Sequence, residues 1–194
     1  AGWLLRIPIL THEQTVVFGL ASKINAFFAK RVAVSFPGSL SHFPRKKAVL
    51  TGNPVRGEIF VKKQPSWFGS SKLPSLPVVY ITGGNQGSSI INSAVLGVLS
   101  ELLEKYIIIH QCGDFDYEFM GKQKEELDDK LKNRYFLLNF IENEEIGWVL
   151  GRADLVVSRA GANTICEIAA LGKPSLLIPI PWSAQDEQTK NAKT

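Results

Sequence analysis

Two side chains suited to recognising a sugar nucleotide stand three residues apart within Ser158–Pro174. Thr164 and Glu167 fall on one face of a predicted helix that follows a glycine turn. A carboxylate on that face is able to accept both hydroxyls of a ribose. The same T-x-x-E spacing is that of a capping box, in which each side chain satisfies the other's backbone N–H. Spacing alone favours the capping box over the ribose site.

The segment around this pair has the order strand, glycine turn, helix. The apolar, β-branched run 155–157 predicts a buried strand, Gly161 allows a tight turn, and a helical pattern covers 163–171. Such a turn leaves N–H groups and the positive end of a helix dipole at the carboxyl edge of a sheet. Anionic ligands bind at this edge in open α/β sheets. The segment therefore predicts an anion-binding edge in an α/β fold.

A second glycine turn lies upstream, between a predicted strand over 78–82 and a predicted helix over 89–105. It is not the dinucleotide fingerprint, because His110 and Gln111 stand where an acidic residue is needed, at the end of the next strand (106–110). It also lacks the Gly-Lys-Ser/Thr of a Walker A motif. One glycine turn is a weak signal, but two that open helices of one sheet predict a phosphate site more strongly.

Composition places the chain among globular proteins. Its 194 residues are 45% hydrophobic and 21% charged, which suits one or two domains with a real core. The net charge of +4 fits phosphate-bearing substrates or an anionic membrane, and the longest basic run, Arg45–Lys47, is too short to indicate nucleic-acid binding. Cys112, Cys166 and the three scattered histidines form no metal or redox motif, so we expect no metal. No apolar stretch reaches membrane-spanning length.

The order of predicted elements indicates three segments. Residues 1–56 read as part of one α/β domain, with strands over 7–10, 31–36 and 48–50 and a helix over 17–29. Residues 57–77, rich in Pro, Gly and Ser, read as an interdomain linker. Residues 78–194 read as a second domain, with further strands over 135–140 and 175–180 and helices over 122–134, 141–151 and 185–192. We expect His12 and Glu13 just past the first strand, at a carboxyl edge, or as caps of the following helix.

Six motifs occur in an order and spacing that resemble those of the MurG-type N-acetylglucosaminyltransferases of peptidoglycan synthesis, over nearly the whole chain. They are His12–Gln14, Thr51–Arg56, Gly83–Gly87, His110–Gln111, Ser158–Ala170 and Asp186–Ala192. The resemblance implies a GT-B fold of two Rossmann-like domains, both incomplete here. It implies an inverting transfer of N-acetylglucosamine from UDP-GlcNAc to lipid I, giving lipid II, without a cofactor.

The resemblance also implies roles for single residues. Arg56 would add charge at the UDP diphosphate, and Glu167 would hold the ribose hydroxyls, which reverses the preference drawn from spacing. The remaining implied contacts are the diphosphate loop (Gly83, Gly84, Asn85, Gln86, Gly87), the uracil backbone contacts (Phe140, Ile141), and residues near the phosphates and sugar (Ala162, Thr164, Gln188, Asn191, Thr15). The family's proposed catalytic base would lie upstream of residue 1, which leaves His12 and Glu13 as weak candidates.

Four positions depart from the family pattern. Asn85 and Ala160 stand where Ser is usual, Thr15 where Asn is common, and Glu187 where Gln or His is usual. The partners implied are UDP-GlcNAc, lipid I and, peripherally, an anionic membrane, at the cytoplasmic face of the bacterial plasma membrane. Trp3 falls where the family carries a membrane-facing apolar patch, with a buried Trp as the equal alternative.

Two other functions stay open. The chain is also compatible with a GT-B transferase or epimerase acting on another UDP-sugar, and with a UDP-binding fragment that turns nothing over. Because the resemblance places the catalytic histidine loop and the closing helices outside the chain, we expect these 194 residues alone to bind donor weakly and to transfer no sugar.

Overall fold

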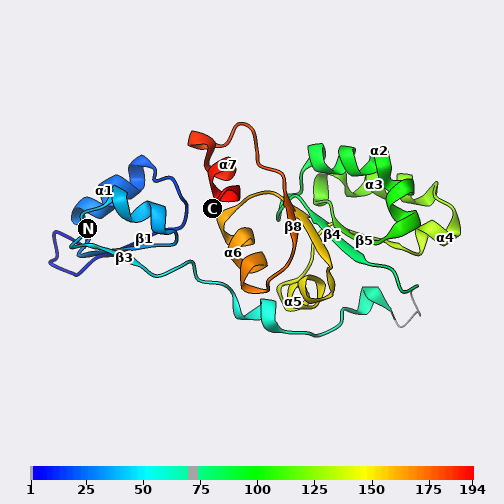
Figure 1. The fold of residues 1–194 in the computed structure, drawn as a ribbon, viewed down its shortest axis with the longest axis horizontal. Coiled ribbons are helices and arrows are strands. Elements are labelled where there is room, and N and C mark those ends of the chain that lie inside the picture. Colours follow the sequence, from blue (N-terminus) through cyan, green and yellow to red (C-terminus); the bar gives the residue numbers. More distant parts are fainter. Residues whose placement is uncertain (1, 70–73) are drawn as a thin grey trace. The chain divides into compact units, whose positions relative to one another are not determined.

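The computed structural model describes residues 2–69 and 74–194 and divides the chain into two compact units (Figure 1). The first unit comprises Ala1–Pro54, Ala160–Cys166 and Pro179–Thr194; the second comprises Val55–Arg159 and Glu167–Ile178. Each unit contains a parallel sheet with helices, so the predicted α/β class is confirmed. The domain boundaries at residues 56 and 77 remain a prediction, and residues 70–73 of the expected linker lie outside the described residues.

The first unit is built on a short parallel sheet with the order β1-β2-β3. Its strands are β1 (Leu10–Glu13), β2 (Arg31–Val34) and β3 (Ala48–Leu50), and its helices are α1 (Leu20–Phe28), η1 (Pro37–His42), η4 (Ala184–Asp186) and α7 (Glu187–Ala192). Its core is small: Ala26 and Ala29 from the region of α1 pack on Val32, Val34 and Phe43.

The second unit contains a larger parallel sheet with the order β6-β5-β4-β7-β8. Its strands are β4 (Val78–Thr82), β5 (Ile107–Gln111), β6 (Tyr135–Leu138), β7 (Leu155–Ser158) and β8 (Ser175–Leu177). Thr82, the last residue of β4, pairs in register with Gln111 of β5 and Ser158 of β7. The loops that follow these three strands therefore leave the same edge of the sheet at one level.

Helices cover both faces of the larger sheet. Figure 1 shows α2 (Ser89–Lys105) and α3 (Asp114–Glu125) on one face and α5 (Asn143–Arg152) on the other. Side chains of β4 alternate between the two cores, as a strand period of two requires: Val79 and Ile81 pack with α2, whereas Val78 and Tyr80 pack with α5. The remaining helices are α4 (Asp129–Lys132) and α6 (Ala162–Ala170), and the division between the units passes through α6.

The first predicted strand is displaced by three residues. It was expected over 7–10 with His12 and Glu13 beyond its end, but β1 runs from Leu10 to Glu13 and contains both residues. Pro8 has no N–H for a sheet ladder, so pairing with β2 begins only where Leu10 meets Arg31. His12 and Glu13 are thus the last residues of a paired strand, and neither caps a helix.

The charged helix predicted over 122–134 is wrong. The structure has α3 over Asp114–Glu125, a turn, and the single-turn α4. Asp114 and Asp116 occupy the first turn of α3, where acidic side chains favour the helix dipole, and this start signal was missed. Smaller boundary errors occur elsewhere: α1 begins at Leu20, β6 ends at Leu138, β8 ends at Leu177, and α7 begins at Glu187 because Gln185 and Asp186 have positive φ.

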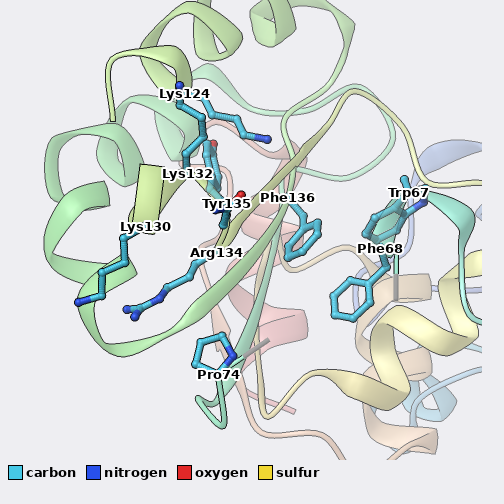
Figure 2. Close-up of a pocket in the computed structure, with 11 residues that line it drawn as sticks. Trp67, Phe68, Pro74, Lys124, Lys130, Lys132, Arg134, Tyr135 and Phe136 are labelled. Atoms are coloured by element: carbon cyan, nitrogen blue, oxygen red, sulfur yellow. The ribbon is translucent and has the colours of Figure 1, made fainter. Parts of the chain in front are cut away.

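Two short 3-10 helices lie in the predicted linker, η2 (Gly57–Phe60) and η3 (Ser66–Phe68), and both belong to the second unit and pack in its core. Ile59 of η2 is 1% exposed within the core beside α5. The close approach of the η2 backbone to α5 requires glycine at position 147, because a Cβ there would collide with the carbonyl oxygens of Glu58 and Val61. A cluster of four rings, Trp67, Phe68, Phe136 and Trp148, holds η3 in place. The centroids of Phe68 and Phe136 are 4.7 Å apart. Figure 2 shows these two rings beside each other.

Candidate functional site

The glycine loop after β4 is tightly packed against the chain that follows β5. Gly84 and Gly87 have φ of +89° and +77°, a region that non-glycine residues seldom adopt. A Cβ on Gly87 would also collide with the carbonyl oxygen of Cys112, and one on Gly113 would collide with that of Gln86. The sequence motif therefore encodes a close backbone contact between two loops at the carboxyl edge of the sheet.

Side-chain hydrogen bonds fix both ends of this loop. The Thr82 hydroxyl accepts the N–H of Gly84 at 3.0 Å, and Ser88 caps α2 by accepting the N–H of Ile91. Asn85 and Gln86, between these anchors, are exposed. The loop thus presents backbone and amide groups beside the N-terminus of a 17-residue helix, where the dipole and free N–H groups favour an anion.

Arg159 supports the loop and was missed as a site residue from the sequence. Its Nη2 donates to the Ser88 hydroxyl at 2.6 Å, and its Nη1 donates to the Ile178 carbonyl at 3.2 Å. Burial lowers the pKa of this guanidinium, whose residue is 8% exposed. A charged residue directly after an apolar strand was the available signal. Arg159 places positive charge on the cap of α2.

Arg56 and Glu167, predicted for the diphosphate and the ribose, are paired with each other. The Arg56 Nε donates to Glu167 Oε1 at 2.6 Å, and Nη2 donates to Oε2 at 3.1 Å. The Arg56 Nη1 donates to the Oδ1 of Asn143, the first residue of α5, at 2.7 Å. The hydrogen bond with Glu167 is the main reason that the pKa of Arg56 is raised. Asn143 was not anticipated as part of this group.

The capping box suggested by the T-x-x-E spacing is not formed. Helix α6 begins at Ala162, and the N–H of Ile165 donates to the Gly161 carbonyl at 3.0 Å. Thr164 is therefore the third residue of the helix rather than its cap, and the Glu167 carboxylate faces Arg56. The assignment of Glu167 to a ribose remains a prediction.

Phe140 and Ile141, predicted to contact uracil through their backbones, follow β6 at the same edge of the sheet. Phe140 is 41% exposed, whereas Ile141 is 4% exposed and packs in the core beside α5. Five predicted contacts thus belong to the second unit: the glycine loop, Arg56, Phe140, Ile141 and Glu167. Of these, the structure joins Arg56 and Glu167 directly.

The other predicted sugar contacts belong to the first unit and already make internal bonds. Gln188 accepts the N–H of Ile180 at 3.0 Å, and Asn191, which is 1% exposed, donates to the Ala160 carbonyl at 3.3 Å. Ala162 is buried and Thr164 is half-buried. Gln188 and Asn191 therefore shape the chain around residues 160 and 180, and a direct contact with a sugar remains a prediction.

Glu13 lies at the carboxyl end of β1, next to the other candidate base, His12, and to the predicted sugar contact Thr15. Its Oε1 accepts the N–H of Thr15 at 3.2 Å and the Thr15 hydroxyl at 3.0 Å. Its Oε2 is buried and, within residues 2–69 and 74–194, has no hydrogen-bond partner. The His12 Nε2 lies 3.1 Å from the Ser35 hydroxyl. Over the same ranges, no group of three or more His, Cys, Asp or Glu side chains is arranged for a metal ion.

Comparisons with known proteins agree on one group. Residues 78–194 match the glycosyltransferase family 28 C-terminal domain. The chain is 39% identical over 196 residues to a Clostridium novyi protein named UDP-N-acetylglucosamine--N-acetylmuramyl-(pentapeptide) pyrophosphoryl-undecaprenol N-acetylglucosamine transferase, covering 98% of this chain and 52% of that protein. A Bacillus cereus protein with the same name followed by the number 2 is 37% identical over 199 residues, covering 100% of this chain and 53% of that protein. The chain thus spans about half the length of these relatives.

Solved structures give the same grouping. Acinetobacter baumannii MurG superposes with a TM-score of 0.69 at 29% identity, covering 99% of this chain and 52% of that one. The Anabaena protein HepE, crystallised with UDP, superposes with a TM-score of 0.53 at 16% identity, covering 99% and 64%, which shows likeness of fold alone. The predicted GT-B class is confirmed by these likenesses together with the parallel sheets.

Proposed function

Because the chain belongs to glycosyltransferase family 28 through its C-terminal domain, we propose that it binds UDP-N-acetylglucosamine for transfer to lipid I. One observation carries the proposal most directly. A glycine loop with positive φ at Gly84 and Gly87 precedes the capped N-terminus of α2, on the same sheet edge from which the chain leads to Glu167. That combination supplies N–H groups and a helix dipole for phosphates, and a carboxylate for vicinal hydroxyls.

The proposed reaction is a direct displacement at the anomeric carbon with inversion. The acceptor hydroxyl forms the new bond to that carbon while the bond to the diphosphate oxygen breaks, and UDP leaves with the electron pair. Negative charge that develops on the diphosphate is stabilised by fixed N–H dipoles of the 83–87 loop and by Arg56. This chemistry needs a general base for the acceptor hydroxyl. Glu13, with a buried oxygen that has no partner in the described part of the chain, is the stronger of the two candidates within the first unit.

We also propose peripheral contact of the first unit with an anionic membrane. Trp3 is 58% exposed, which favours the surface alternative over a buried indole. Large apolar side chains near it are also exposed, among them Leu4 at 76% and Phe27 at 76%. Trp3, Leu4 and Phe28 line a hollow of about 420 Å³. None of the described helices has both the length and the apolarity to cross a bilayer.

Calorimetric titration with UDP-GlcNAc, UDP and UDP-glucose tests the donor proposal. We expect UDP-GlcNAc to bind more tightly than UDP-glucose. Equal affinities would contradict the proposal and would indicate an enzyme for another UDP-sugar. The Glu167→Ala variant should weaken UDP by roughly 1.5–3 kcal/mol, the range for hydrogen bonds to a charged group. Glu101→Ala, an exposed position on α2, is the matched control and should leave UDP affinity unchanged. Loss of stability in Glu167→Ala with unaltered UDP affinity would contradict the ribose assignment.

A further inference from the structure

Arg56 covers the carboxylate that the proposed function assigns to ribose. Two guanidinium nitrogens bond to the two separate oxygens of Glu167, at 2.6 and 3.1 Å. With Arg56 in this position, the Glu167 side chain is only 11% exposed, whereas the Arg56 side chain is 38% exposed. A ribose that approaches both oxygens of Glu167 from the side that Arg56 occupies therefore competes with the guanidinium for them.

The displaced guanidinium needs a new anion. Leaving Glu167 removes two charge-assisted hydrogen bonds, and the remaining bond, from Nη1 to Asn143 Oδ1 at 2.7 Å, goes to a neutral amide. A nucleoside offers hydroxyls to Glu167 but nothing to Arg56. A nucleoside diphosphate offers hydroxyls to Glu167 and a polyanion that suits the planar, bidentate guanidinium.

On the premise of the proposed function, we propose that Arg56 couples recognition of the ribose to recognition of the diphosphate. In the free protein Arg56 neutralises and covers Glu167; in the complex it turns to the phosphates, with Asn143 holding Nη1 as the positioning contact. Exchange of the pair is feasible because more than a third of the Arg56 side chain is exposed and the pair is therefore screened by solvent. Nucleosides consequently bind more weakly than the loss of phosphate contacts alone would predict, because they must also compete with Arg56 for Glu167.

The coupling predicts opposite effects of one substitution on two ligands. In Arg56→Gln the carboxylate is no longer held by a cation, so uridine should bind about 3- to 10-fold more tightly than to the wild-type chain. UDP loses its bidentate partner and should bind at least about tenfold more weakly, as expected for a lost charge-assisted bond. Arg56→Lys keeps one charge and should move both affinities in the same directions by less.

Calorimetric titration of the whole chain with uridine, UMP and UDP provides the measurement. The matched control is Arg152→Gln, an exposed arginine on α5 that should leave all three affinities unchanged. If Arg56→Gln and Arg56→Lys weaken uridine and UDP in parallel, or leave uridine unchanged, the coupling is wrong while UDP binding by the wild type still supports the proposed function. A wild-type chain that binds none of the three ligands overturns both.

Discussion

Each of the two units contains a buried carboxylate, and the two carboxylates differ in their hydrogen-bond partners. Glu167 in the second unit has both oxygens bonded to one guanidinium. Glu13 in the first unit has one oxygen bonded to Thr15, while the other is buried without a partner in the described part of the chain. Burying an uncompensated carboxylate is costly, whereas pairing it with a hydrogen-bonded cation offsets that cost.

The contrast extends to loops that follow strands of the two sheets. In the second unit the glycine loop is pressed against Cys112, and the strand end of β5 is locked by a hydrogen-bonded histidine. In the first unit Gly52 also has positive φ, at +75°, but nothing lies within 4 Å of the position its Cβ would take. The sheet edge of the second unit is therefore held in place by contacts within the unit. The sheet edge of the first unit has free space beside Gly52 and, in the described part of the chain, an unpaired acceptor in Glu13 Oε2.

The largest difference in stability should appear when one methyl group is added to each loop, at Gly87 in the second unit and at Gly52 in the first. Gly87→Ala combines positive φ with a collision against the Cys112 carbonyl, so it should lower the free energy of unfolding by roughly 2–5 kcal/mol. Gly52→Ala carries only the backbone strain, about 1–2 kcal/mol. Urea unfolding of both variants measures the difference. Equal losses would mean that the second loop can relax, and the contrast in preorganisation would fail.

Acid should destabilise the second unit through His110. This residue is 0% exposed; its Nε2 donates to Asn92 Oδ1 at 3.0 Å, and its Nδ1 accepts from the Tyr135 hydroxyl at 2.9 Å. Burial lowers the pKa of His110 from 6.5 to about 4. The unfolded chain therefore binds a proton that the folded chain does not between these values. Stability is full above pH 6.5 and falls by about 3 kcal/mol as pH drops toward 4.

The acid effect can be assigned to one unit by fluorescence. Replacing Trp3 and Trp182 with Phe leaves Trp67 and Trp148, which both pack in the second unit, as reporters of its urea unfolding. His110→Gln should flatten the dependence between pH 6.5 and 4.5, because the glutamine does not titrate. His42→Gln, in the first unit, serves as the matched control. A wild-type slope that survives in His110→Gln would exclude His110 as its source.

The smallest effect is also the most direct test of the two carboxylates. Glu13→Gln removes a buried charge whose Oε2 lacks a partner in the described chain, and it should raise stability by about 1 kcal/mol. Glu167→Gln leaves Arg56 facing an amide and should lower stability by about 1 kcal/mol, a figure limited by the solvent exposure of Arg56. Thermal unfolding of the two variants gives the signs. Changes of the same sign would show that the carboxylates are not differently compensated.

Local patterns were sufficient for the elements whose apolar face and end signals agree. The boundaries predicted for β3, β4 and α2 coincide with those in the structure, because each is bounded by turn residues or by a Ser cap and has its apolar period intact. Helix α3 was missed because its aromatic residues do not mark its buried face: Phe115 is 89% exposed and Phe119 is 57% exposed, while Met120 is buried. A periodicity argument has no way to detect such a helix.

The candidate site shows the same limit at longer range. Its residue types and motif positions were predicted, but the pair between Arg56 and Glu167 joins positions 111 residues apart. Nothing in either local pattern indicates that a cation from one motif neutralises the carboxylate of another. The same holds for Asn143, which accepts a hydrogen bond from Arg56, and for Arg159, which donates one to Ser88 across 71 positions of the chain. The residue types of the site could be predicted from the sequence, whereas the pairing of Arg56 with Glu167 is visible only in the folded structure.

Gly147 shows how a position can reject every substitution without taking part in any chemistry. It lies inside α5, where a helix would tolerate alanine well, yet the backbone of η2 occupies the volume of any side chain. In a saturation mutagenesis screen this codon should accept glycine alone and would score like a catalytic residue. The backbone of η2 is held so close to α5 that even one methyl group separates them. A tolerance map of this protein therefore has to be divided into positions that bind ligand and positions where two segments of backbone touch.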